Sequence, residues 1–152
     1  MQMQLETVTS LSEVTNFLSR CGLLTSDISD ASPSYFFGLR NQNALAGVIG
    51  FEQYGEMGLL RSLAVAPTMR TEGIGRRLVT YTEDFARGKG IRDLFLLTNT
   101  ATLFFSRLGY KVLPRRDAPA AIRQTQQFAH LCPASSDLMH KSITTTTPTP
   151  AH

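Results

Sequence analysis

The segment from residue 70 to residue 75 combines residue types that suit the binding of a phosphate group. It reads R-T-E-G-I-G and follows the L-x-V-x-P pattern of residues 63–67. Glycines let a ligand approach the backbone closely. The first amides of a helix have no partner inside it and lie at the positive end of its dipole. With Arg70, Arg76 and Arg77 close by, the segment predicts a phosphate or pyrophosphate site.

Two other phosphate-binding loops do not fit this segment. The nucleotide P-loop ends in Gly-Lys-Ser or Gly-Lys-Thr, which is absent here, and the dinucleotide fingerprint would require glycine where the chain has Leu78. A bare G-x-G also fits a tight turn into a packed helix that binds nothing. The residues around the glycines must decide between these readings.

The elements that would position this segment follow from the hydrophobic pattern. A strand over 57–65, a helix over 75–87 and an unbroken apolar strand over 93–98 predict a βαβ unit with parallel strands. Before it, the pattern predicts an antiparallel meander. The other expected elements are strands at 5–7, 35–40, 44–54, 110–113 and 138–143, and helices at 11–21 (capped by Ser10 or Ser12), 100–108 and 119–128. The expected fold class is α+β (α/β): one domain over 1–143 with a mixed, mainly antiparallel sheet and flanking helices, then a disordered tail at 144–152.

Composition narrows the classes of protein and partner. The chain has 152 residues, 42% of them hydrophobic, which suits one folded domain. Its net charge is +3 without a long basic run, so no nucleic-acid partner is expected. Cys21 and Cys132 form no metal-binding pair, and we expect no metal. No apolar stretch suits a secretory signal or a membrane span, so a cytoplasmic protein without a membrane partner is expected.

The residues around the glycines resemble the GNAT superfamily of acetyltransferases. Its first motif, L-x-V-x-P followed by [QR]-x-x-G-x-[GA], is matched by Leu63, Val65, Pro67, Arg70, Gly73 and Gly75. A second motif, roughly N-x-x-A-x-x-[FL]-Y-x-x-x-G-[FY], is matched by Ala101, Phe104, Gly109 and Tyr110. The resemblance covers residues 35–110 well and the two ends weakly.

The resemblance implies a GNAT-like fold, acetyl-CoA as cosubstrate and N-acetyltransferase activity. It implies that the backbone of residues 63–65 pairs with the pantetheine arm, that the amides of residues 71–76 hold the pyrophosphate, and that residues 98–105 line the thioester end. The predicted cofactor-binding residues are Leu63, Ala64, Val65, Arg70, Thr71, Glu72, Gly73, Ile74, Gly75, Arg76, Thr98, Ala101, Phe104 and Phe105.

The segments 59–67, 96–110 and 118–136 look like N-acetyltransferases found among arsenic-resistance genes, which in turn look like N-acetylglutamate synthase. This implies a small-molecule amine as acceptor: an amino acid or an analogue, an arsenic-containing one included. Acetylation of a protein or peptide, or a regulatory module that binds acetyl-CoA without catalysis, stays open, and so does a homodimer.

The catalytic groups are not assigned by the sequence. Many family members have a tyrosine as general acid where this chain has Phe105, and phenylalanine cannot donate a proton. Alternation along the strand places Leu59, Arg61 and Leu63 on one face. Arg61 stands where relatives can carry a glutamate base. An arginine there could bind the carboxylate of a substrate. It could equally be a surface arginine at the edge of the strand, without a role in the site. Glu52 and Glu56 are the nearest acids.

Overall fold

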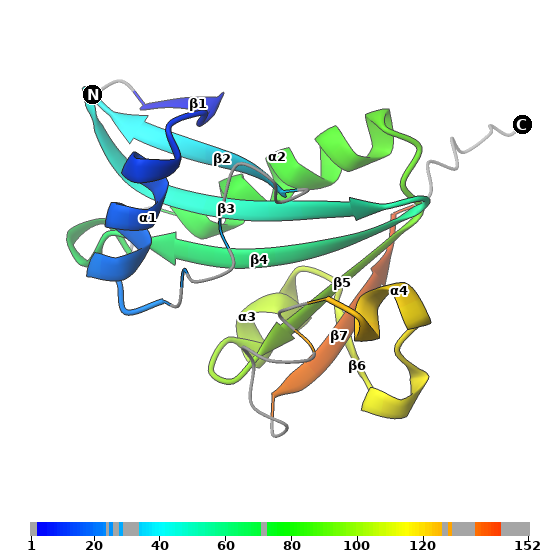
Figure 1. The fold of residues 1–152 in the computed structure, drawn as a ribbon. Coiled ribbons are helices and arrows are strands. Elements are labelled where there is room, and N and C mark those ends of the chain that lie inside the picture. The colour runs from blue at the N-terminus through cyan, green and yellow to red at the C-terminus, as the bar shows by residue number, and fades with distance from the viewer. Residues whose placement is uncertain are drawn as a thin grey trace, which may run out of the picture. The chain divides into compact units, whose positions relative to one another are not determined.

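The structure, a computed structural model, describes residues 3–23, 25, 28, 34–70, 73–125, 128 and 136–143. Thr71, Glu72, Cys132 and the tail expected at 144–152 lie outside the described residues. The elements, labelled in Figure 1, are β1 (Met3–Thr7), α1 (Leu11–Arg20), β2 (Ser34–Asn41), β3 (Ala44–Tyr54), β4 (Met57–Val65), η1 (Pro67–Met69, a 3-10 helix), α2 (Ile74–Gly88), β5 (Asp93–Thr98), α3 (Thr102–Arg107), β6 (Lys111–Leu113), η2 (Arg115–Asp117, a 3-10 helix), α4 (Ala120–Arg123) and β7 (Asp137–Ser142).

The strands follow the order β1-β2-β3-β4-β5-β7-β6 in one sheet. The pairs β1–β2, β2–β3, β5–β7 and β6–β7 are antiparallel. Strands β4 and β5 are parallel, with residues 57–59 opposite residues 93–95, and α2 connects them along the chain. The predicted βαβ unit within a mainly antiparallel sheet is therefore confirmed.

Contacts between residues divide the chain into two compact units. The first contains Met1–Glu52 and Leu60–Thr82, and the second contains Gln53–Leu59 and Glu83–His152. Strand β4 and helix α2 each contribute residues to both units.

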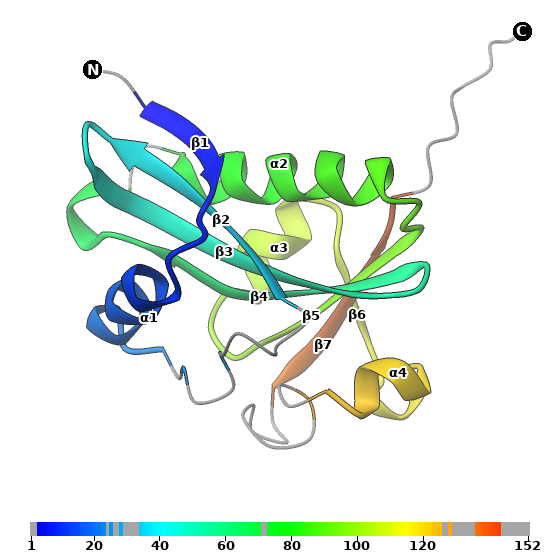
Figure 2. The same cartoon turned by 45° about the horizontal axis from the view of Figure 1, so that its top comes forward.

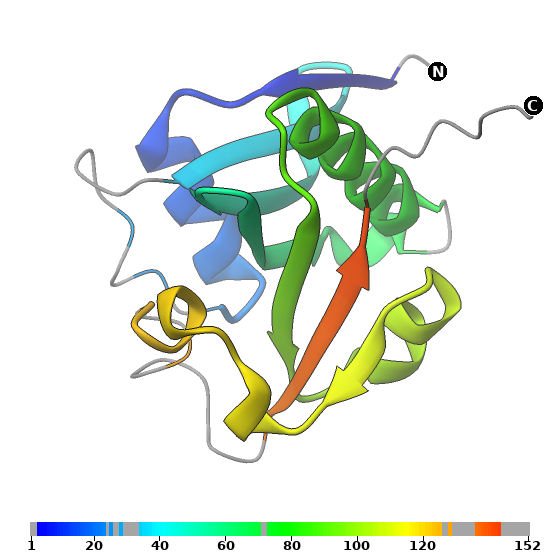
Figure 3. The ribbon, with the colours of Figure 1, turned by 90° about the vertical axis from the view of Figure 1, so that its right-hand side faces the viewer.

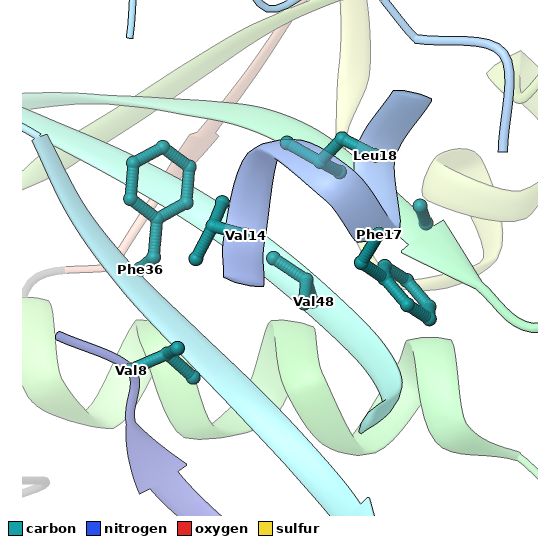
Figure 4. Packing of buried hydrophobic residues seen from close by; sticks show 7 residues of the cluster. Val8, Val14, Phe17, Leu18, Phe36 and Val48 are labelled. Carbon is teal, nitrogen blue, oxygen red and sulfur yellow. The ribbon is translucent and has the colours of Figure 1, made fainter. Parts of the chain in front are cut away.

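In the first unit, α1 covers one face of β2 and β3 with an apolar stripe (Figure 4). Val14, Phe17 and Leu18 of this helix are buried and belong to the same core cluster as Phe36 and Val48 of the strands. The helix begins after Ser10, whose hydroxyl accepts a hydrogen bond from the Glu13 amide at 3.3 Å. This bond satisfies one of the amides that a helix start leaves without a partner, and it settles which serine is the cap.

The first half of α2 packs on the other face of the same strands (Figure 2). The rings of Phe37 and Tyr81 meet edge to face with centroids 5.2 Å apart. Gly47 of β3 allows the helix to come close: a Cβ there would lie 2.7 Å from Ile74 Cγ2 and 2.9 Å from Leu78 Cδ1. A missing side chain in β3 thus sets how near the start of α2 can lie to the strand.

In the second unit, β5, β7 and β6 lie side by side, with β6 outermost (Figure 3). Phe95 and Leu138 pack in one core cluster with Leu59, and Ala118 and Ile122 from the η2–α4 segment complete it. Leu94 pairs with Lys141 in the ladder. Because successive side chains alternate between faces, Leu94 and Lys141 point to the face opposite Phe95.

The predicted strands at 44–54, 57–65 and 93–98 have the bounds seen in the structure. Two predicted helices are shorter. The helix expected at 119–128 ends at Arg123, because the Thr125 hydroxyl donates to the Ile122 carbonyl at 2.8 Å and competes with further helical bonding. The helix expected from residue 100 begins at Thr102, because the Ala101 amide donates to the Thr98 hydroxyl at 2.9 Å.

Candidate functional site

The segment that follows β4 turns tightly before α2 begins. Pro67, Thr68 and Met69 form the 3-10 turn η1, and the Met69 amide donates to the Ala66 carbonyl at 2.8 Å. The exposed Arg70 folds back so that its Nε donates to the Val65 carbonyl at 3.2 Å. The predicted cation Arg70 therefore also ties the loop to the end of β4.

Gly73 leads the chain into α2 with φ +73, a left-handed conformation that glycine adopts at little cost. A Cβ at this position would meet nothing within 4 Å, so the space beside the backbone is open. The first amides of α2, from Ile74 to Arg76, lie where a helix offers no internal acceptor. Open space beside the backbone and amides without an acceptor inside the helix suit an anion.

The described residues of the motif, from Leu63 to Arg76, fall into three groups by exposure. Ile74 is 1% exposed, and Ala64 is also buried, so both serve the core. Arg70 and Arg76 are exposed, whereas Leu63, Val65 and Gly75 are half-buried. Among the predicted cofactor contacts, Ile74 can therefore act only through its backbone. The positive charge beside a bound phosphate must come from Arg70 and Arg76.

Arg61 lies in the interior of the first unit. Its side chain is 0% exposed, and its Nη1 donates to Glu52 Oε2 at 2.8 Å. Its Nε donates to the hydroxyl of the neighbouring Ser62 at 3.0 Å. The interpretation of Arg61 as a surface arginine is therefore wrong. A contact between Arg61 and the acceptor remains a prediction.

Strand β4 does not keep its alternation beyond Ser62, which has φ +56. A Cβ on Gly50 would lie 2.9 Å from Arg61 Cγ and 2.8 Å from Phe36 Cε1. Phe36 belongs to the same core cluster as Ala64. Arg61 therefore shares a face with Ala64, three residues away, and the expected grouping with Leu63 is wrong. One extra residue in the left-handed region, as in a β-bulge, accounts for the shift.

The second motif lies at the end of β5 and in α3, within the second unit. Thr98 accepts the Ala101 amide through its hydroxyl, and this bond shapes the turn before α3. Phe104 is half-buried, but Phe105 is only 6% exposed. The Phe105 ring meets Phe104 at 5.0 Å and Tyr110 at 5.6 Å between centroids, both edge to face. Phe105 is thus a core residue as well as a predicted cofactor contact.

A buried polar network fixes the end of this motif. The Tyr110 hydroxyl donates to Glu83 Oε2 at 2.8 Å, and Lys141 Nζ donates to the same oxygen at 3.0 Å. Lys141 also donates to the Leu108 carbonyl at 2.8 Å. Burial, and then the Glu83 carboxylate, raise the pKa of Tyr110 far above its usual range. A phenol held protonated in this way acts as a donor within the fold.

Sequence reasoning did not find this network, the Arg61–Glu52 pair or the shift at Ser62. Glu83 and Lys141 are 58 residues apart in the chain, and no local pattern joins them. A serine inside an apolar strand was the one local signal for the shift, because serine tolerates a turn conformation better than a β-branched residue does. Within the described residues, no three His, Cys, Asp or Glu side chains gather as a metal site, and no helix is long and apolar enough to span a membrane.

The comparison with protein families decides what the two motifs belong to. Residues 6–110 match the family model described as the acetyltransferase (GNAT) family. The chain belongs to the GNAT family. The expected α+β, GNAT-like fold is confirmed by this match and by the mixed sheet, which has seven strands.

Proteins described as N-acetyltransferases match part of this chain. An uncharacterized N-acetyltransferase, CT2212, from Chlorobaculum tepidum is 40% identical over 63 residues, which are 41% of this chain and 40% of that protein. The N-alpha-acetyltransferase 80 of Mus musculus is 41% identical over 54 residues, 36% of this chain and 17% of that protein. The chain thus spans less than half the length of these relatives.

Among solved structures, N-acetylglutamate synthase from Neisseria gonorrhoeae, complexed with coenzyme A and N-acetyl-glutamate, has a TM-score of 0.75. The likeness covers 94% of this chain and 35% of that one, at 20% sequence identity. At that identity the likeness shows a shared GNAT fold.

Proposed function

We propose that this chain is an N-acetyltransferase that moves the acetyl group of acetyl-CoA to the amine of a small molecule. One observation carries the proposal: the family motif from Leu63 to Gly75 contains an open, left-handed glycine, Gly73, directly before α2 begins. The membership in the GNAT family and the coenzyme A in a structure of the same fold support it.

In this proposal the first turn of α2 holds the pyrophosphate through its backbone amides. Arg70 and Arg76 are exposed and supply positive charge beside it. The backbone of Leu63, Ala64 and Val65 pairs with the pantetheine arm as an added strand would. Thr98, Ala101, Phe104 and Phe105 are proposed contacts of the thioester end, with Phe105 contributing only a ring edge because it is buried.

The reaction requires a neutral amine that attacks the thioester carbonyl. The new C–N bond forms, the C–S bond breaks, and the amine gives up a proton while coenzyme A leaves as thiol or thiolate. A backbone amide near Val65 is the proposed donor to the oxyanion. A thiol pKa of about 8.5 makes thiolate a fair leaving group, and an α-amino group with a pKa of about 8 is partly neutral at pH 7. Positioning can therefore supply much of the rate.

The proposed acceptor is an amino acid or an amino-acid analogue, an arsenic-containing one included. This rests on the resemblance to the arsenic-resistance acetyltransferases and on the N-acetyl-glutamate bound by a protein of the same fold. Arg61 is the predicted partner of the acceptor's carboxylate. Because Glu52 already pairs with this guanidinium, a carboxylate would have to join or replace Glu52 there.

Thermal unfolding with and without acetyl-CoA tests the proposal. A ligand at 100 times its dissociation constant stabilises the folded state by about 2.7 kcal/mol, and we expect a rise in Tm for acetyl-CoA but none for pantetheine, which lacks the pyrophosphate. A thiol-release assay over amino acids, their arsenic-containing analogues, polyamines and peptides then identifies the acceptor. Unchanged Tm at saturating acetyl-CoA contradicts the proposal. Binding without thiol release for any amine favours a regulatory module.

A further inference from the structure

Ser62 has an unusual backbone conformation for its place in the chain. It lies inside strand β4 with φ +56, a region that residues with a Cβ occupy only at a cost in free energy. The other non-glycine residue with positive φ among those described is Gln42, with φ 62, in the turn between β2 and β3. A turn explains Gln42, but Ser62 needs neighbours that hold it in place.

Two side chains supply that hold. The Ser62 hydroxyl accepts a hydrogen bond from Arg61 Nε at 3.0 Å, and Arg61 Nη1 donates to Glu52 Oε2 at 2.8 Å. Counted as whole residues, backbone included, Arg61 and Glu52 are 4% and 5% exposed. Gly50 makes room for the arginine, since a Cβ there would lie 2.9 Å from Arg61 Cγ. The residues Glu52, Arg61 and Ser62 form a chain from β3 to the bulge in β4.

A buried ion pair of this kind is weak evidence for a role in stability alone. Removing two charges from water costs about as much as their attraction returns, and apolar replacements are often neutral. What such a pair does provide is a fixed geometry, because a planar guanidinium held at two nitrogens cannot rotate. Here the fixed group is bonded to the one described strand residue with a strained backbone.

The bulge at Ser62 lies directly before residues 63–65, whose backbone is proposed to pair with the pantetheine arm of acetyl-CoA. Ser62 shifts the alternation so that Ala64 is buried and Leu63 and Val65 are half-buried. The backbone groups of these residues rotate together with their side chains. The conformation of Ser62 therefore sets where the amides and carbonyls of residues 63–65 point.

We propose that Glu52 and Arg61 are positioning residues that hold the Ser62 bulge and thereby orient the backbone of residues 63–65 for acetyl-CoA. This rests on the proposed function, because it assumes that those residues meet the cofactor. It gives Arg61 a different task from binding the acceptor. The main readout is therefore the dissociation constant for acetyl-CoA, which can be measured without knowing the acceptor.

A double-mutant cycle between Arg61 and Ser62 tests the proposal. Arg61→Met keeps most of the length of the side chain and removes its hydrogen bonds, and we expect it to weaken acetyl-CoA binding about tenfold, the scale of one strained backbone residue. Glycine at position 62 adopts positive φ without help from Arg61. In the Ser62→Gly background, Arg61→Met should therefore weaken acetyl-CoA binding by a much smaller factor. Glu52→Gln should weaken binding in the same direction as Arg61→Met, by a smaller factor.

Arg40 offers a matched control. It is a second ion-paired arginine of the same unit, bonded to Glu6 and Glu13 at 2.7 Å each. Arg40→Met should lower Tm and leave acetyl-CoA binding unchanged. Circular dichroism checks each variant for folding. If Arg61→Met does not fold, Glu52→Gln measured with and without Ser62→Gly completes the cycle.

Three results would contradict either the bulge mechanism or the proposed function, and they can be told apart. If Arg61→Met loses the same acetyl-CoA affinity in the wild-type and in the Ser62→Gly background, the bulge mechanism is overturned. Unchanged acetyl-CoA affinity with a raised KM for the amine identified by the thiol-release panel assigns Arg61 to the acceptor instead, and also overturns it. Failure of the wild-type protein to bind acetyl-CoA counts against the proposed function, and a crystal structure of Arg61→Met that keeps Ser62 at positive φ then overturns the inference separately.

Discussion

The hydroxyl of Tyr110 donates a hydrogen bond to Glu83 over 2.8 Å, joining the end of the second family motif to helix α2. Lys141 of β7 donates to the same carboxylate oxygen over 3.0 Å. Tyr110 is 2% exposed and its ring packs against Phe105. The aromatic residues of α3 are therefore held by a polar network that begins on another helix.

Tyr110→Phe removes one donor from this network and leaves the ring in place. We expect a loss of about 1.5–3 kcal/mol in the free energy of unfolding, the range for a hydrogen bond to a charged group. Because folding raises the pKa of Tyr110, its contribution is complete below the usual pKa of 10.0 and falls as pH rises above it. Urea unfolding of both proteins at pH 7 and pH 10.5 measures this. A difference that grows with pH contradicts the assignment.

Glu13 predicts the opposite dependence on pH. Its bond to Arg40 lowers the pKa of the Glu13 carboxyl below the ordinary 4.5, so its contribution to stability is present above that value. The contribution is lost as pH falls through the lowered pKa. The Tm difference between wild type and Glu13→Gln should therefore be largest near pH 7 and shrink toward pH 3. A difference that stays constant over this range shows that the charge of Glu13 does not matter.

Gly47→Ala tests the close approach of α2 to β3. The new Cβ would lie 2.7 Å from Ile74 Cγ2 and 3.3 Å from the Ala64 carbonyl oxygen, so we expect a loss of about 1–3 kcal/mol from overpacking. Displacement of Ile74 should also weaken acetyl-CoA binding, measured by calorimetry. Gly88→Ala, at the last residue of α2, is the control: nothing lies within 4 Å of its Cβ, and alanine there should raise stability by at most about 0.5–1 kcal/mol, the gain inside a helix. Equal effects of the two changes on stability argue against the packing explanation.

Gly73→Ala tests the loop itself, with Gly22→Ala as its partner. Both glycines have positive φ (+73 and +84), and in both cases a Cβ meets nothing within 4 Å. Both variants should lose about 1–2 kcal/mol of stability, the cost of a left-handed alanine. We expect only Gly73→Ala to weaken acetyl-CoA binding as well, about tenfold or more. Equal affinity in the two variants would remove the loop from the cofactor site.

The sequence predicted the parts of the fold that repeat a simple pattern. Apolar runs bounded by turn residues placed the strands at 44–54, 57–65 and 93–98 correctly, and glycines placed the ends of helices closely. The family motif predicted the loop at Gly73, because a glycine at this place in the motif allows the left-handed turn that leads into the helix. These features depend on neighbours within a few residues of each other.

The features that the sequence did not predict depend on residues far apart in the chain, or on one irregular residue. Arg61 was expected beside Leu63 because strands alternate, and a single left-handed residue is enough to break that rule. Its partner Glu52 comes from another strand. Whether a charged residue faces water or another charge is decided by tertiary packing, which periodicity does not contain.

The irregularity at Ser62 gives strand β4 an unusual response to a change in its length. Deleting a residue from a regular strand exchanges the inward and outward sides of everything on one side of the cut. Deleting Ser62 would instead leave Arg61 and Ala64 two residues apart, so that strict alternation keeps both on the face they share now. In a scan of single-residue deletions, Ser62 should therefore stand out as a position inside a strand whose loss the core tolerates. Ser62 is thus one residue more than a regular strand needs at this place. If the core tolerates its deletion, packing does not explain why the strand contains it.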